Sequence, residues 1–213
     1  MKTEQLIALL AREAEPVDRR APVRAFALAV AVGVTAAVAL IRTPLASDLL
    51  VPAYFAEPML WVKLAFGITL ALSSLWAAAR LARPGVQLSI AGALPFLPLA
   101  AVWLLAAIVL ATAPPGQREA LIWGRTWSTC PATIALLSLP TFVGALLALR
   151  KMAPTRPMWA GAAAGALAGG VGAAVYALQC PELAAPFLAV WYVLGVAIPV
   201  MVGAVLGRYL LRW

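Results

Sequence analysis

Histidine is absent from this chain of 213 residues, which also has only two cysteines and eight acidic residues. Without histidine the chain lacks the commonest metal ligand and the usual proton carrier near neutral pH. No acidic residue lies in the middle of a long apolar segment, where ion-coupled transporters keep such groups for function. The sequence also has no phosphate-binding loop, no HExxH motif and no nucleophile elbow. We therefore predict a protein that is not an enzyme, with no catalytic residue, metal ligand or cofactor.

Hydrophobic residues are abundant, at 64% of the chain, and charged residues are scarce, at 11%. Soluble domains are about half apolar and about a quarter charged. The apolar residues form six segments close to the roughly 20 residues that a helix needs to cross a bilayer. These segments cover about residues 25–41, 59–79, 88–111, 131–149, 158–178 and 183–206. The sequence thus predicts an all-α bundle of six transmembrane helices, with the lipid bilayer as its surroundings.

Lysine and arginine predict the orientation of this bundle, because cytosolic loops of membrane proteins are enriched in both. Twelve of the 16 basic residues fall in the N-terminal region and in alternate connections, and only three fall on the opposite side. Both termini are therefore predicted to be cytosolic. Nucleic-acid binding is not expected, since the basic residues form no stripe with interleaved aromatics. The three on the opposite side are Arg42, Arg118 and Arg125.

The first 24 residues are charged and largely polar, and they predict a cytosolic tail separate from a transmembrane domain over residues 25–213. Within the tail, Thr3 is suited to cap a short helix that Pro16 ends. A helix of about eleven residues is marginal alone in water, so its apolar stripe needs a partner. That partner is another protein or, in the competing interpretation, the lipid surface or the bundle itself. The residues of the stripe are Leu6, Ile7, Leu9 and Leu10.

Small residues repeat at four-residue spacing in the fifth and sixth segments, and proline interrupts the third, fourth and sixth. Small residues one turn apart let membrane helices approach closely, so we expect the fifth segment at the centre of the bundle. The packing residues are predicted to be Gly161, Gly165, Gly169, Gly203 and Gly207. Proline inside a helix is expected to kink or open it, and these prolines are Pro95, Pro98, Pro140 and Pro199.

Cys130 and Cys180 each stand directly before a proline on the predicted outer side. Proline is favoured at the first position of a helix, so each thiol is predicted near solvent at a helix N-terminus, which favours the thiolate. Two such thiols suit a reversible disulfide or the capture of an oxidant or thiophilic metal. The competing interpretation is that they are small buried hydrophobic residues. The chain has no CxxC motif, so neither a zinc ribbon nor a thioredoxin-type site is indicated.

Lys63 is the one charged residue inside a predicted span, and it lies about four residues from the outer end. A lysine stem is long enough to carry its ammonium to the membrane interface from that depth. We therefore expect Lys63 to point towards the interface.

Several motifs together resemble the NrsF type of membrane protein, over nearly the whole chain. In the tail they are a Leu-Ile-x-x-Leu pattern, Pro16-Val17 and Arg19-Arg20. Further along they are Trp127-x-x-Cys130-Pro131, Ser138-Leu139-Pro140, Ala153-Pro154-Thr155-Arg156-Pro157, Tyr176-Ala177-Leu178-Gln179-Cys180-Pro181-Glu182 and Trp191-Tyr192-x-x-Gly195.

The resemblance implies an anti-sigma factor with six helices in the bacterial inner membrane. Such a protein holds an extracytoplasmic-function sigma factor of the SigF kind until stress arrives. It implies that the tail binds the sigma factor and that Cys130 and Cys180 sense oxidants or heavy metals from the periplasm. Gln179 departs from the histidine that often precedes the second cysteine, which argues against metal binding through imidazole. A membrane thiol oxidoreductase or a small-solute transporter is the alternative function.

Overall fold

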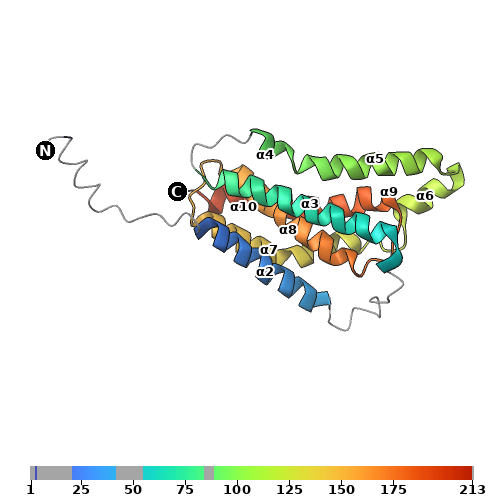
Figure 1. Cartoon of the computed structure of the whole chain (residues 1–213), viewed down its shortest axis with the longest axis horizontal. Coiled ribbons are helices and arrows are strands. Elements are labelled where there is room, and N and C mark those ends of the chain that lie inside the picture. Colours follow the sequence, from blue (N-terminus) through green and yellow to red (C-terminus); the bar gives the residue numbers. More distant parts are fainter. Residues whose placement is uncertain (1–2, 4–20, 42–54, 84–88, 213) are drawn as a thin grey trace.

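The computed structural model describes residues 3, 21–41, 55–83 and 89–212 of the chain, and their regular structure is helical, without strands. The long helices lie side by side in a bundle (Figure 1). In chain order the elements are α2 (Ala21–Ile41), α3 (Pro58–Leu81), α4 (Ser89–Ala93), α5 (Phe96–Thr112), α6 (Pro115–Trp123), α7 (Cys130–Arg150), α8 (Pro157–Ala177), α9 (Ala185–Phe187), the π-helix η2 (Leu188–Tyr192) and α10 (Val193–Leu210).

Five of the described helices are long and apolar enough to cross a membrane. They are α2, α3, α7, α8 and the continuous helix formed by α9, η2 and α10. Their outward faces carry many exposed large hydrophobic side chains, such as Leu28, Leu136 and Met201. A bundle that is apolar on its outside as well as its inside is suited to a lipid environment. The all-α class and five of the six predicted segments are thereby confirmed.

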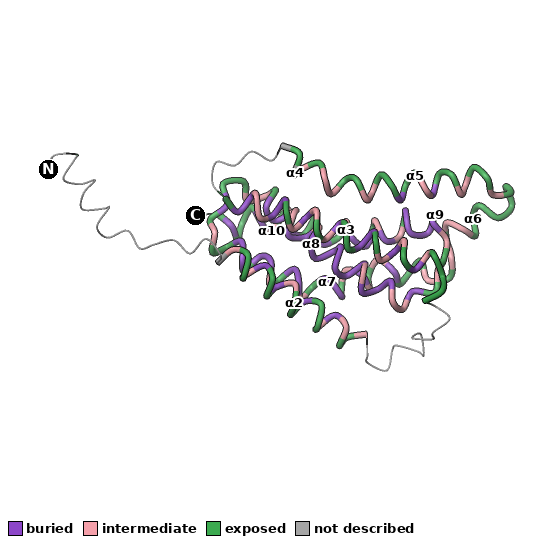
Figure 2. The backbone as a smooth tube through the Cα atoms, in the orientation of Figure 1, coloured by how far each residue is buried: buried purple, intermediate pink, exposed green. Residues whose placement is uncertain are grey.

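The third predicted segment, over about residues 88–111, differs from the other five because the structure divides it. The short helix α4 ends at Ala93 and α5 begins at Phe96, so the chain turns at Leu94 and Pro95. Proline has no N–H to continue a helix, and its ring clashes with the preceding turn, which accounts for the break. Helix α5 has 17 residues, of which only Val102 and Ala106 are buried, and it lies along the outside of the bundle (Figure 2).

Helix α8 lies at the centre and packs against α3, α7 and α10. Alanine and glycine make up 14 of its 21 residues, and most of it is buried (Figure 2). A Cβ atom on Gly161 would overlap the carbonyl group of Gly203, and one on Gly165 would overlap the backbone of Pro199. The backbones of α8 and α10 are therefore in direct contact. Such contacts replace the hydrophobic driving force that lipid cannot supply between helices.

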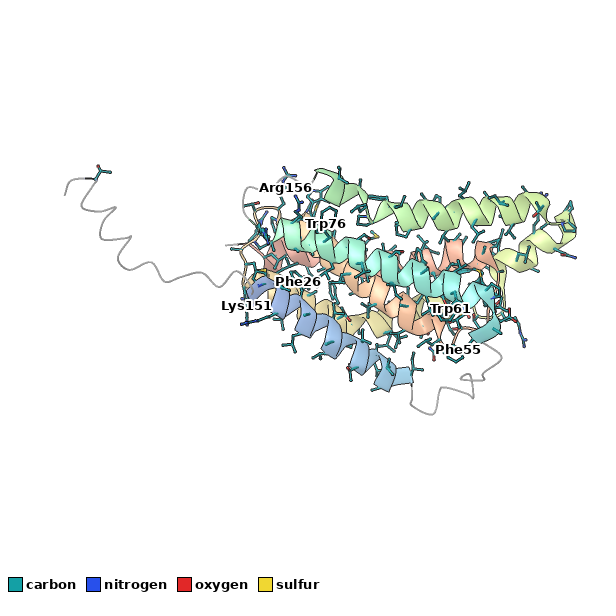
Figure 3. All side chains as sticks on the ribbon, viewed as in Figure 1. Phe26, Phe55, Trp61, Trp76, Lys151 and Arg156 are labelled. Carbon is teal, nitrogen blue, oxygen red and sulfur yellow. The ribbon has the colours of Figure 1, made fainter. Side chains whose placement is uncertain are left out.

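The two ends of the bundle differ in charge. One end, called the basic end below, holds the start of α2, the end of α3, the α7–α8 connection and the end of α10. Its described charged residues are all basic: Arg24, Arg80, Arg83, Arg150, Lys151, Arg156, Arg208 and Arg212. The described carboxylates Glu57, Glu119 and Glu182 lie towards the opposite end. Figure 3 shows Lys151 and Arg156 at the basic end and Phe55 and Trp61 at the opposite end.

Candidate functional site

Both cysteines lie at the end opposite the basic end, where α7 begins and α8 finishes. Cys130 is the first residue of α7, and its N–H donates to the carbonyl oxygen of Thr126 at 3.0 Å. The N–H of Cys180 donates to the carbonyl oxygen of Tyr176 at 3.1 Å, which closes the last turn of α8. Both side chains are fully buried, and the two are not joined in a disulfide. Their thiols lie close enough to interact electrostatically.

The prediction of solvent-exposed thiols at two helix N-termini is therefore wrong in two respects. Each cysteine is 0% exposed, because its side chain points into the bundle. In addition, Pro181 does not open a helix, since α9 begins only at Ala185 and takes Pro186 into its first turn. Cys180 thus belongs to the end of α8. The helix-dipole argument for a thiolate applies to Cys130 alone.

Lys63 on α3 reaches this site from the side. Its side chain is only 1% exposed, and its Nζ donates to the carbonyl oxygen of Cys180 at 2.8 Å. The expectation that Lys63 points towards the membrane interface is therefore wrong. Helix α3 packs along α8, so the stem of Lys63 runs inwards to the carbonyl groups at the end of α8, which have no partner within the helix. The ammonium also interacts electrostatically with Cys130, Cys180 and Glu182.

Two tyrosines complete the buried group. The rings of Tyr176 on α8 and Tyr192 on η2 lie 5.5 Å apart, and both side chains are buried. Both phenol groups lie near the two cysteines. We call Lys63, Cys130, Tyr176, Cys180 and Tyr192 the thiol cluster. It joins α3, α7, α8 and η2 at one point of the bundle.

The connection between α6 and α7 is fastened beside the thiol cluster. Glu182 accepts hydrogen bonds at Oε1 from the backbone N–H groups of Arg125 (2.7 Å) and Thr126 (3.2 Å). The indole N–H of Trp191 donates to the carbonyl oxygen of Ile122 at 2.8 Å. Gly124 has a φ of 57°, a left-handed conformation that favours glycine, and a Cβ there would touch Glu182. Hydrogen bonds from two backbone N–H groups to a charged carboxylate are stronger than bonds to a neutral acceptor. We call this arrangement the Glu182 clamp.

Comparison with known proteins decides the family. The family model described as "NrsF: Negative regulator of sigma F" matches residues 10–213. The chain is 44% identical to the "Probable anti-sigma-F factor NrsF" of Azospira oryzae, over the whole of both chains. It is 40% identical to the "Anti-sigma-F factor NrsF" of Caulobacter vibrioides, again over the whole of both. This chain belongs to the NrsF family.

The resemblance inferred from the sequence motifs is thereby confirmed. The names of both relatives describe regulators and not enzymes, which agrees with the prediction that this chain is not an enzyme. No solved structure matches the chain.

Sequence reasoning missed three of the five residues in the thiol cluster as site residues. For Lys63 the sequence predicts the wrong direction, although a lone charge inside an apolar span is itself a signal of function. Tyr176 and Tyr192 belong to the motifs that carry the family resemblance, and the sequence alone does not assign either of them to the site. Tyr192 also lies in a π-helical turn, and such turns are frequent at functional sites. A π-helical turn depends on packing, which no local pattern in the sequence indicates.

Two other predicted groups lie away from this site. The tail residues Leu6, Ile7, Leu9 and Leu10 fall outside the described residues. Gly203 and Gly207 lie on the half of α10 that leads to the basic end, where they face Gly161.

The chemistry available to the cluster is that of two thiols beside one ammonium. Among the described residues, no group of three or more histidine, cysteine or acidic side chains could hold a metal ion. A buried ammonium stabilises a neighbouring thiolate, because opposite charges attract strongly where water is excluded. The thiolate is the form that reacts with oxidants and binds soft metals. Burial disfavours the charged form of both thiols, so their modification also requires the cluster to open.

Proposed function

We propose that this NrsF-family chain is a membrane anti-sigma factor whose thiol cluster controls release of its partner. Residues 1–24 would bind an extracytoplasmic-function sigma factor, of the SigF kind, in the cytosol. Residues 25–213 would form the domain in the bacterial inner membrane, with Cys130 and Cys180 responding to oxidants or heavy metals. The observation that carries the proposal is that both cysteines of a chain with anti-sigma-F relatives lie together with a buried ammonium.

Six spans with both termini in the cytosol follow if α5 crosses the membrane too. A helix of 17 residues is roughly 25 Å long, slightly less than the roughly 30 Å of hydrocarbon. The preceding α4 and the turn at Pro95 extend this segment at the basic end. The charge difference between the ends supports the same orientation, because the side rich in lysine and arginine faces the cytosol. The thiol cluster would then lie near the periplasmic surface.

The tail is suited to reversible binding. Burial of its four large aliphatic side chains would contribute roughly 6–12 kcal/mol before costs. Ordering the segment takes back roughly 2–5 kcal/mol, and loss of rigid-body freedom takes more. The resulting affinity is moderate, which suits a partner that must be released. The aliphatic side chains are those of Leu6, Ile7, Leu9 and Leu10.

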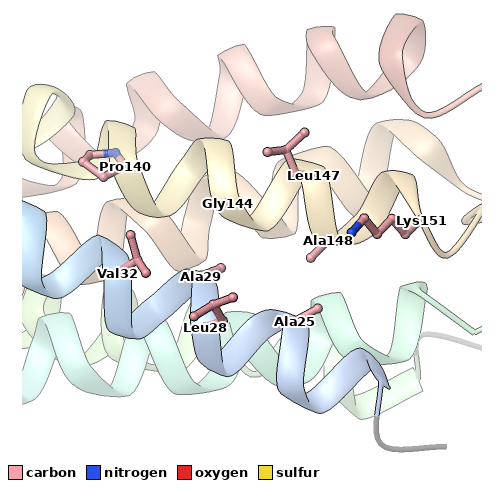
Figure 4. A pocket seen from close by; sticks show the side chains of 9 residues that line it. All are labelled: Ala25, Leu28, Ala29, Val32, Pro140, Gly144, Leu147, Ala148 and Lys151. Carbon is pink, nitrogen blue, oxygen red and sulfur yellow. The ribbon is translucent and has the colours of Figure 1, made fainter. Parts of the chain in front are cut away.

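Helices α7 and α2 offer a continuous route from the thiols to the tail. Helix α7 begins at Cys130 and packs against α2, which is the helix that follows the tail. The two helices meet closely where Gly33 faces Thr141 and where Gly144 faces Ala29. Beside this contact lies a groove of about 270 Å³, lined by both helices and by Lys151 (Figure 4). Helix α2 is also the least buried of the five spans, so a shift of α7 would displace it more easily than the others.

The oxidant that we consider is hydrogen peroxide. One thiolate attacks a peroxide oxygen, the O–O bond breaks, and the leaving oxygen takes up a proton to become water. The second thiol then attacks the resulting sulfenic acid, and a disulfide forms with loss of a second water. Two thiols are oxidised by two electrons and the peroxide is reduced to two waters. For a thiophilic metal ion, each thiol would instead release a proton on binding.

Co-purification tests the tail. The full-length protein in detergent is expected to retain an extracytoplasmic-function sigma factor co-expressed from the same organism, and a variant with Leu6, Leu9 and Leu10 changed to serine is expected to lose it. Equal recovery with both would remove the tail from the proposal.

The thiols are tested separately by sigma-dependent transcription in cells given peroxide or a cadmium salt. Cys130→Ser and Cys180→Ser variants are expected to lose the response while still repressing. A normal response in both variants would remove the thiols and leave the anti-sigma function standing.

A further inference from the structure

A pocket at the basic end contains three arginines that the proposed function does not use. It has a volume of about 380 Å³ and lies between the start of α8 and the end of α10. Its lining consists of Arg156, Pro157, Met158, Trp159, Arg208 and Arg212. Because residues some 50 positions apart in sequence meet here, the pocket is a product of the fold and not of a local run of basic residues.

The arginines of this pocket have no acidic partner among the described residues. All three are exposed, and the described carboxylates lie towards the other end of the bundle. The Nε–H of Arg208 donates to the Sδ atom of Met158 at 3.2 Å, which holds the guanidinium against the start of α8. Three guanidinium groups around one cavity create a positive field that attracts an anion. Arginine also matches phosphate oxygens in geometry, since its N–H groups can donate in pairs.

The other side chains of the pocket indicate what kind of anion it binds. Trp159 is 54% exposed beside the arginines, and tryptophan prefers the head-group level of a bilayer. Pro157 and Met158 add apolar surface to the same lining. A free phosphate ion or an acidic peptide has no acyl chain to contact such surface. A phospholipid has both a phosphate and a chain, and basic pockets at the cytosolic ends of membrane helices are typical sites for anionic lipids.

We propose that this pocket binds the head group of an anionic phospholipid, with the phosphate held by Arg156, Arg208 and Arg212. The acyl chains would extend from the head group along Trp159 into the surrounding bilayer. Binding there would tie the start of α8 to the end of α10 at the membrane surface. The inference depends on membrane insertion and does not depend on sigma-factor binding or on thiol chemistry.

The test compares two triple variants of the full-length protein in nanodiscs. One carries Arg156→Gln, Arg208→Gln and Arg212→Gln, and the matched control carries Arg80→Gln, Arg83→Gln and Arg150→Gln. The control removes the same charge from the same end outside the pocket. Native mass spectrometry measures how much phosphatidylglycerol each protein retains against phosphatidylcholine. The pocket variant is expected to lose roughly 10- to 100-fold in relative affinity, and the control less than about threefold. Equal losses in both would overturn the proposal.

Two further arms decide the source of the phosphate and guard against misfolding. Inorganic phosphate at tens of millimolar is expected to leave the bound phosphatidylglycerol in place, and displacement of the lipid would show a simple phosphate site instead.

In the parent protein, brominated phosphatidylglycerol is expected to quench tryptophan emission more than brominated phosphatidylcholine, with the difference lost in Trp159→Phe. No difference would overturn the proposal even if the triple variant failed to fold. If the pocket variant kept its lipid and lost the sigma factor, the occupant would be an acidic segment of that partner.

Discussion

Lys63 occupies a position where a charged side chain is costly, since it is almost completely buried within an apolar helix. Membrane proteins rarely keep such a residue unless it has a partner and a role. Here the partner is the carbonyl oxygen of Cys180, and both thiols lie within electrostatic range of the ammonium. Its position makes Lys63 a positioning residue for Cys180 as well as a stabilising charge for a thiolate.

Replacement of Lys63 by methionine is therefore expected to slow alkylation of the cysteines several-fold at constant pH. The thiolate would lose its nearest positive charge. The carbonyl group of Cys180 would also lose its donor, at a cost of about 1–3 kcal/mol in the free energy of unfolding. Alkylation by a small uncharged reagent, followed by mass spectrometry, measures the rate, and Lys63→Arg is the control that keeps the charge. Unchanged rates in Lys63→Met would remove Lys63 from the site.

Gly161 is expected to tolerate no side chain, because its backbone lies directly against that of Gly203. Gly161→Ala would force α8 and α10 apart, which is expected to cost about 1–3 kcal/mol. Thermal unfolding in detergent measures the loss. Gly116→Ala is the matched control, since a Cβ at Gly116 meets nothing within 4 Å. Similar stability of the two variants would show that α8 and α10 are not closely packed.

At the scale of elements, the Glu182 clamp joins the connection before α7 to the connection after α8. In the same short region, the N–H of Cys130 donates to the carbonyl oxygen of Thr126. Any movement that exposes the thiols through this connection must therefore break the hydrogen bonds of Glu182 or the contact between Trp191 and Ile122. We therefore expect the clamp to limit how often a reagent reaches the buried thiols.

Replacement of Glu182 by alanine is expected to speed alkylation of both cysteines by roughly tenfold or more. Hydrogen bonds to a charged group are worth about 1.5–3 kcal/mol, and their loss would favour opening by that amount. Glu119→Ala removes a carboxylate from the exposed surface of α6 and is expected to leave the rate unchanged. Equal rates in the two variants would place the route to the thiols elsewhere.

The elements themselves were largely predictable, because apolar length and flanking charge are local properties. The cysteine site was only half predictable. Pro131 stands in the first turn of α7 as expected, but Pro186 and not Pro181 occupies the first turn of α9. Both prolines suit a helix start, and the choice depends on how the connection packs on the bundle. The direction of Lys63 depends in the same way on the contact between α3 and α8, which no local pattern reveals.

At the scale of the whole molecule, the thiol cluster lies at the end of the bundle opposite the basic end, and we call it the thiol end. The proposed topology sets the two ends on opposite sides of the membrane. Accessibility of single reporter cysteines tests this in a background where Cys130 and Cys180 are serine. Ser128 is exposed at the thiol end and Thr155 is exposed at the basic end, so Ser128→Cys and Thr155→Cys provide the two reporters.

An impermeant maleimide is expected to label Ser128→Cys in intact spheroplasts and Thr155→Cys only after the membrane is opened, because the basic residues should face the cytosol. Labelling of Thr155→Cys in intact spheroplasts, or of both positions there, would contradict the orientation. The measurement does not depend on the identity of the sigma factor.

Helix α8 has one more consequence for how a signal would travel. Its backbone lies directly against those of α3 and α10, since Gly170 faces the backbone of Ala71 and Gly161 faces that of Gly203. With no side chains between these backbones to change rotamer, α8 has little room to slide past either neighbour. A disturbance beside Cys180 is therefore expected to displace α3, α8 and α10 together, as one unit.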